Sequence, residues 1–90
     1  MNKDEVVSIA RADLAGRLGV EEGQITTVSA EDAVFPDAAL GAYLEDEMAA
    51  DMLTNGWRVN LKGPDGTAAE YRANTKQARL YQFRGENHLL

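Results

Sequence analysis

The fold of this chain is decided by Gly56-Trp57-Arg58-Val59-Asn60-Leu61-Lys62-Gly63-Pro64-Asp65-Gly66-Thr67-Ala68-Ala69-Glu70-Tyr71-Arg72, a stretch that predicts a β-hairpin together with its turn. Apolar Trp57, Val59 and Leu61 alternate with polar residues, as in a strand with one buried face and one exposed face. We therefore expect two antiparallel strands whose apolar side chains share one face of a sheet.

The turn between these two strands has a suitable residue at each corner. Pro64 presets φ for the first corner of a type I turn, Asp65 suits the second, and Gly66 takes the left-handed position that follows. Closing the hairpin around this turn places Val59 opposite Tyr71, which keeps the apolar side chains on one face.

A helix is predicted from Lys3 to Leu18. Asn2 and Glu5 have the spacing of a capping box, in which each side chain satisfies a free backbone donor. Gly19 can take the left-handed conformation that ends a helix. Apolar residues at helical spacing form one stripe, which comprises Val6, Val7, Ala10, Leu14 and Leu18. We expect this stripe to pack on the apolar face of the hairpin.

Further strands are expected on both sides of the hairpin. β-Branched residues favour a strand over residues 25–30, with a bulge or bend at 31–32, where the apolar alternation changes phase. Residues 78–84 predict the last strand, and we expect residues 85–90 to form a flexible tail.

The middle of the chain, from Ala38 to Thr54, allows two assignments. Apolar residues recur every four positions from Leu40 to Met52, which favours a helix. Gly41 weakens such a helix by about 1 kcal/mol relative to Ala, and a loop followed by a strand is the alternative. The predicted fold class is α+β, in a single domain over residues 1–90. It has an N-terminal helix packed on an antiparallel sheet of three to four strands, with a second helix in the middle.

The composition excludes several classes of function. The chain has 90 residues, no cysteine, nine Lys and Arg residues, and a net charge of −6. Nucleic-acid binding depends on clustered cations, so we expect no nucleic-acid partner. No apolar run approaches the ~20 residues that cross a bilayer. The N-terminus shows no export signal, so we expect a cytoplasmic protein without a membrane partner.

Groups that carry catalysis or bind metals are scarce. His88 is the single histidine and lies in the expected tail, which excludes a hydrolytic triad and a zinc site. The acids between residues 45 and 51 lack the alternating ligands and the glycine of a calcium loop. Residues 63–66 form a turn rather than a phosphate loop, because no helix start follows them. We expect no enzyme activity, no cofactor and no metal.

Four motifs of the chain resemble a small uncharacterised prokaryotic α+β domain. They are Ala12-Asp13-Leu14-Ala15-Gly16-Arg17-Leu18-Gly19-Val20, Phe35-Pro36-Asp37 with Leu40-Gly41, Leu53-Thr54-Asn55-Gly56-Trp57-Arg58-Val59, and Glu70-Tyr71-Arg72. In the same order, that domain has A-x-L-A-x-R-L-G-V, W-P-D-x-S-L-G-C-P, L-T-P-G-Y-R-V and Y-x-Y-H. The resemblance covers most of the chain and implies a helix-then-sheet layout similar to PepSY and cystatin-like domains. It implies no particular activity, and the domain often occurs in exported bacterial proteins.

The chain departs from this domain at two places. Ala42 and Tyr43 stand where the domain has Cys-Pro, and Arg72 stands where it has His. A role of that Cys and His is therefore not implied here. The domain's Pro- and Gly-rich stretch after Leu-Gly implies a loop, in contrast to the helix that the residue spacing favours.

These observations favour a non-catalytic module that binds or regulates another protein. The predicted contact surface combines apolar anchors with acidic residues and comprises Tyr43, Leu44, Glu45, Asp46, Glu47, Met48 and Asp51. One alternative is a homodimer that pairs the free edge of the last strand and hides Tyr81 and Phe83. The other is a small-ligand-binding domain with a pocket between helix and sheet.

Overall fold

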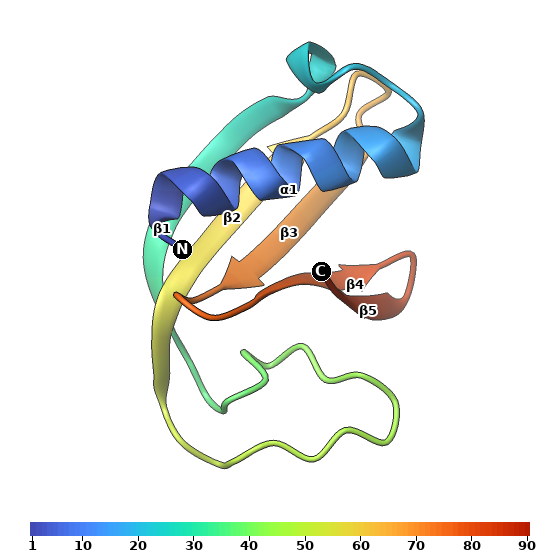
Figure 1. The fold of residues 1–90 in the computed structure, drawn as a ribbon. Helices are drawn as coiled ribbons and strands as arrows, with labels where there is room; N and C mark the ends of the chain where they lie inside the picture. The colour runs from blue at the N-terminus through green and yellow to red at the C-terminus, as the bar shows by residue number, and fades with distance from the viewer.

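A computed structural model describes residues 1–90 as one α-helix and five strands (Figure 1). In chain order the elements are α1 (Lys3–Leu18), the 3-10 turn η1 (Glu22–Gln24), β1 (Thr26–Phe35), β2 (Thr54–Lys62), β3 (Ala68–Ala73), β4 (Ala78–Phe83) and β5 (Glu86–Leu89). Each strand pairs antiparallel with its neighbour in sequence, so the sheet order is β1-β2-β3-β4-β5. No helix of the chain has the length and apolar character needed to cross a membrane. The α+β class is confirmed.

The helix α1 has the predicted bounds and the predicted caps. The Asn2 carboxamide accepts from the Glu5 backbone N–H at 2.9 Å, and the Glu5 carboxylate accepts from the Asn2 N–H at 3.2 Å. At the other end Gly19 has φ 68°, and the Val20 N–H donates to the Ala15 carbonyl at 3.0 Å. These local bonds satisfy backbone groups that a helix end leaves free.

The main core lies between α1 and one face of the sheet, as the helix crosses that face in Figure 1. Val59, Tyr71 and Leu80 lie side by side on β2, β3 and β4 and are fully buried. Val6 and Leu14 of α1 are fully buried against this cluster. Each such side chain contributes about 1.5–3 kcal/mol when it leaves water. The predicted packing of the helix on the hairpin is confirmed.

A polar network closes the core beneath α1. The Tyr71 hydroxyl donates to the Asp13 carboxylate at 2.7 Å, and the Arg17 guanidinium donates to the same oxygen at 2.6 Å. Burial raises the pKa of Tyr71, and the bond to Asp13 raises it further. The bond to Asp13 also raises the pKa of Arg17. The network fixes how the helix sits on β3.

The hairpin turn has the predicted geometry. The Gly63 N–H donates to the Thr67 carbonyl at 2.8 Å, and Gly66 has φ 89°. The Asp65 carboxylate accepts from the Thr67 N–H at 2.9 Å. Strand pairing places Val59 opposite Tyr71, so the register predicted from the turn is confirmed.

The end of the chain corrects two predictions, because the sheet has five strands and residues 85–90 are not a flexible tail. Gly85 has φ 84° and turns the chain back, so that β5 pairs with β4. The Asn87 carboxamide accepts from the Gln82 N–H at 2.7 Å, and the Leu90 N–H donates to the Ala78 carbonyl at 3.0 Å. Since β5 occupies the outer side of β4, the edge expected for a homodimer is already paired.

The irregularity of β1 lies earlier than predicted. The pairing with β2 shifts between Thr27 and Ser29, which leaves Val28 as the extra residue of a bulge. From Ser29 to Phe35 the register is regular, so no bulge lies at residues 31 and 32. The apolar alternation of the sequence breaks at residues 31 and 32 because both acids lie on an exposed part of the strand.

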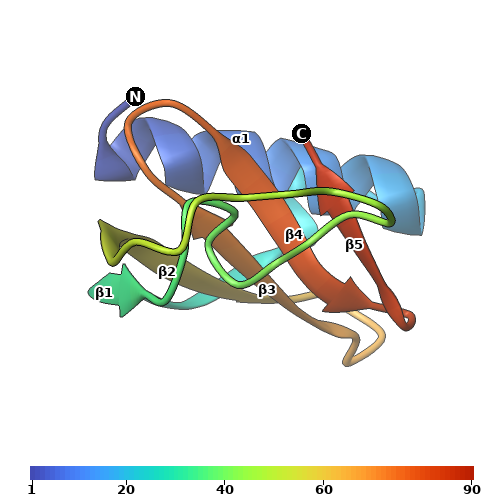
Figure 2. The ribbon, with the colours of Figure 1, turned by 90° about the horizontal axis from the view of Figure 1, so that it is seen from below.

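The predicted second helix over residues 38–54 is absent. Leu40, Gly41 and Asp46 have φ values of 59°, 68° and 61°, which an α-helix cannot accommodate. Residues 36–53 form instead a long segment that crosses β4 and β5 in the view of Figure 2. This irregular segment is unusually long for a connection inside a small domain, where such loops commonly have a function.

Candidate functional site

The segment 36–53 is held by polar side chains of the sheet that reach its backbone carbonyl groups. These bonds join Gln77 to Ala38 at 2.8 Å, Arg72 to Leu40 at 3.0 Å, Arg79 to Ala42 at 3.1 Å and Asn87 to Tyr43 at 2.7 Å. A helix would need the same carbonyl groups for its own backbone bonds. These bonds therefore stabilise a non-helical course in this segment.

A small apolar cluster supports the first half of the segment. Four buried apolar residues lie outside the main core: Phe35, Ala39, Leu40 and Ala42. The Arg72 guanidinium lies 5.4 Å from the centre of the Phe35 ring and 3.5 Å from that of Tyr81, a cation–π arrangement. Gly41 takes a left-handed φ of 68°, which favours glycine, and an added Cβ there would lie 2.7 Å from the end of the Arg72 side chain.

Asp37 orders the start of the segment. Its carboxylate accepts from the backbone N–H groups of Ala39 at 2.9 Å and Gly41 at 3.0 Å. Burial opposes ionisation, but these two donors and the Tyr43 hydroxyl more than offset it and lower the pKa of Asp37. The hydrogen bond to Asp37 in turn raises the pKa of Tyr43. The carboxylate is therefore a structural group and not a free acid.

The Glu47–Arg79 ion pair ties down the middle of the segment. Both carboxylate oxygens of Glu47 accept from the Arg79 guanidinium, one of them at 2.7 Å, and the Leu44 N–H donates to Glu47 at 3.0 Å. The Arg79 side chain is only 6% exposed, whereas that of Glu47 is 23% exposed. Arg79 and the Leu44 N–H lower the pKa of Glu47 from 4.5 to about 2. This pair is the strongest single attachment of the segment.

The structure separates the seven residues predicted as a contact surface. Glu47 faces Arg79, and Leu44 is half-buried, so neither is freely available. Glu45, Asp46, Met48 and Asp51 are exposed, and Met48 reaches 97% exposure. Tyr43, also exposed, lines a hollow of about 370 Å³ together with Leu44, Glu45, Gly85 of the β4–β5 turn, and residues 86 and 87 at the start of β5.

Two further apolar residues of the segment were not predicted as part of the surface. Leu53 is 76% exposed, and Met52 is exposed as well. Both directly follow Asp51 and precede β2, so they extend the exposed surface toward the sheet. The sequence contained a signal for them, since two large apolar residues directly follow an acid here.

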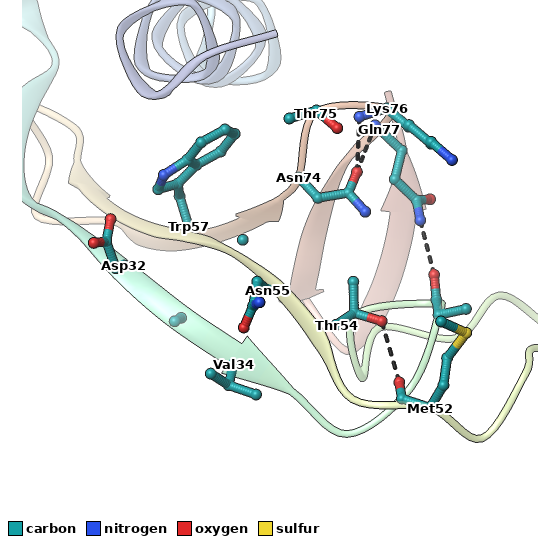
Figure 3. A pocket seen from close by; sticks show the side chains of 13 residues that line it. Asp32, Val34, Met52, Thr54, Asn55, Trp57, Asn74, Thr75, Lys76 and Gln77 are labelled. Atoms are coloured by element: carbon teal, nitrogen blue, oxygen red, sulfur yellow. Dashed lines mark hydrogen bonds between the residues drawn. The ribbon is translucent and has the colours of Figure 1, made fainter.

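A larger groove lies beyond Met52, with a volume of about 880 Å³ (Figure 3). Trp57 forms one wall, and Figure 3 shows its ring on the side of the sheet that faces α1. Residues 32–34 of β1, residues 54–56 of β2 and the turn 74–77 complete the lining, together with Ala38 and Met52. The Asn74 carboxamide accepts from the backbone N–H groups of Lys76 and Gln77, which fixes this turn. No motif of the sequence predicts this groove.

No cluster of side chains in the structure has the composition of a metal site. No group of three His, Cys, Asp or Glu side chains converges on one point. His88, placed in a tail by the sequence analysis, lies in β5 and pairs with Leu80 across the strands. The candidate functional site is therefore a pair of surfaces: the exposed acidic segment and the groove beside Trp57.

Comparison with known proteins gives a family and no activity. A family model described as "Domain of unknown function (DUF8738)" matches residues 7–81. The match begins within α1, includes all of β1, β2 and β3, and ends within β4. No curated protein and no solved structure matches the chain. The chain belongs to the family of the domain of unknown function DUF8738.

Proposed function

We propose that this domain is a non-catalytic module that binds or regulates another protein through the acidic segment containing Tyr43, Glu45, Asp46, Met48 and Asp51. The observation that carries the proposal is the contrast within this segment. Its backbone between residues 38 and 43 is held by bonds to three strand residues and one turn residue, yet Met48 is 97% exposed. An anchored backbone loses little conformational entropy on binding.

The apolar side chains of the segment supply a reason for binding. Met48, Met52 and Leu53 follow one another on an exposed course, and none belongs to the core. Methionine adapts its shape to a partner at low cost, and apolar area removed from water favours association. Such a surface suits a protein partner better than a small polar molecule.

The charges of the segment indicate the chemistry of the partner. Glu45, Asp46 and Asp51 are exposed, and none forms an ion pair within the chain. The whole chain carries a net charge of −6. We infer a partner that presents basic residues around an apolar patch, because complementary charges speed encounter and fix orientation.

A test of this proposal reverses two exposed charges without touching the anchors. In E45K/D51K the Glu47–Arg79 pair is retained, and in the control E22K/D4K the same number of exposed acids is reversed elsewhere. Tagged protein captures partners from an extract of the native host, and mass spectrometry quantifies them. We expect proteins that the wild type and the control capture and E45K/D51K does not. Identical capture by all three proteins would contradict the proposal.

A second candidate function, small-ligand binding, is favoured by one observation. The groove beside Trp57 has a volume of about 880 Å³, within the range of ligand sites. Trp57 is the only tryptophan of the chain, so its fluorescence reports directly on an occupied groove. A metabolite set that leaves this fluorescence unchanged would argue against the candidate.

The remaining expectations belong to the same proposal. A helix followed by an antiparallel meander agrees with the layout of PepSY and cystatin-like domains, but a shared layout is weak support for a shared function. A cytoplasmic location and the absence of enzyme activity stay predictions from the sequence.

A further inference from the structure

β1 is an edge strand with an open outer side. It pairs with β2 alone, and no strand lies beyond it in Figure 1. No backbone group of Thr26–Phe35 takes part in a hydrogen bond outside the strand pairing. Half of the backbone N–H and C=O groups of this strand therefore point to solvent, which is the arrangement that an added strand can complete.

The usable part of this edge lies beside the groove. The bulge at Val28 interrupts the first third of the strand, whereas Ser29–Phe35 is regular. Asp32 lies directly opposite Trp57, and Val34 lies opposite Asn55. All four residues line the groove. A strand added to this edge would place alternate side chains toward the groove, because side chains alternate between the two faces.

The acidic residues on the outer edge of β1 favour a basic segment over a second copy of this chain as the added strand. Glu31 and Asp32 lie in the middle of the regular stretch and are exposed, and the Asp32 side chain is 85% exposed although Lys3 lies 3.2 Å away. A second copy of the chain would bring the same acids against each other, and like charges on paired strands destabilise them. A basic segment would meet charges of opposite sign on both faces of the strand.

We propose that the outer edge of β1 accepts an extended basic segment of a partner protein as a sixth strand, with one of its apolar side chains in the groove beside Trp57. This inference goes beyond the proposed function, because it assigns a different surface from the acidic segment. Main-chain bonds supply affinity in this mode, while the acids and the groove supply specificity.

The test uses three synthetic peptides of equal length and follows the fluorescence of Trp57 and the NMR signal of its indole N–H. In the first peptide Lys and Val alternate. The second has the same sequence with every backbone nitrogen methylated, which removes the N–H donors from both edges of the peptide. The third has Glu in place of Lys. We expect the first peptide to shift both signals and the other two to bind at least about tenfold more weakly.

Protein variants locate the site. In E31K/D32K the affinity for the Lys–Val peptide should fall at least about tenfold, whereas the control E22K/D4K and the variant E45K/D51K should bind as the wild type does. Unfolding in urea verifies that each variant is folded. Equal binding of the methylated peptide, unchanged binding to E31K/D32K, or no binding by the wild type would overturn the inference. Loss in E45K/D51K alone would also overturn it, while leaving the acidic segment as the binding surface.

Discussion

Replacing Arg79 by Met removes the central attachment of the segment 36–53. The guanidinium donates to Gln77 at 2.8 Å, to the Ala42 carbonyl at 3.1 Å, and to both carboxylate oxygens of Glu47. Methionine keeps much of the apolar stem but donates to none of these acceptors, and Glu47 retains only the Leu44 N–H. The segment would lose its tie to β4, while the main core beneath α1 would stay intact.

The expected cost follows from the burial of the pair. Removing one partner of a fully buried ion pair costs about 3–5 kcal/mol. Glu47 is 23% exposed and can be hydrated again when the segment moves. We therefore expect R79M to lower the free energy of unfolding by less than that, about 2–3 kcal/mol. For a domain of this size that corresponds to a fall in Tm of roughly 10–20 °C.

Urea unfolding followed by Trp57 fluorescence measures this free energy. The control K62M removes an exposed cation that forms no ion pair, and it should change stability by less than about 0.5 kcal/mol. In an E47Q background the R79M change should cost at least about 1 kcal/mol less than in the wild type. A cost of R79M below that of the control, or the same cost in both backgrounds, would refute the reasoning.

Three further predictions concern pH, the polar network of the core and two glycines. The pKa of Glu47 is lowered from 4.5 to about 2 in the folded chain. Its contribution to stability is therefore complete above about pH 4.5 and is lost as the pH falls toward 2. Urea midpoints measured between pH 7 and pH 2 should fall less for E47Q than for the wild type. Tyr71→Phe removes the hydroxyl bond to a carboxylate that Arg17 still holds, so chemical unfolding should show a loss of about 1.5 kcal/mol, and no loss would contradict the network. Gly56→Ala places a Cβ 2.0 Å from the Ala73 carbonyl oxygen and should lower the free energy of unfolding by about 1–3 kcal/mol. The Cβ of Gly16→Ala, inside α1, meets nothing within 4 Å, so this variant should be more stable by about 0.5–1 kcal/mol. Thermal melts that rank the two variants in the opposite order would disprove this account of the glycines.

The parts of the fold that were predictable depend on neighbours in sequence. The capping box joins Asn2 to Glu5, and the hairpin turn joins Gly63 to Thr67. Each signal lies within one short window, so the residues themselves determine the local conformation. The apolar alternation then fixed the register, because a slip by one residue would expose Val59 and Tyr71.

The middle segment was not predictable in this way. Its carbonyl groups are bound by side chains 32 to 44 positions away in the sequence. Helical spacing over 38–54 is a weak preference, and such distant contacts override it. Arg79 and Gln77 look like ordinary polar residues of a strand and its turn until the sheet brings them to the segment.

The candidate surfaces were predictable only in part. Met48 and its neighbouring acids were expected to be exposed on functional grounds, and they are exposed. Glu47 was grouped with them because its partner Arg79 is distant in sequence. The groove beside Trp57 arises where the end of β1, the start of β2 and the turn 74–77 meet, a juxtaposition that follows from topology rather than from any single motif.

The central claim is that side chains of the sheet hold the segment 36–53 in an ordered, non-helical course. NMR with amide hydrogen exchange tests it most directly in the wild-type chain. We expect backbone chemical shifts without helical character over 38–54. We also expect slowed exchange at the N–H groups of Ala39 and Gly41, which donate hydrogen bonds to the Asp37 carboxylate. Helical shifts over this range, or exchange at these two amides as fast as in an unfolded peptide, would contradict the claim.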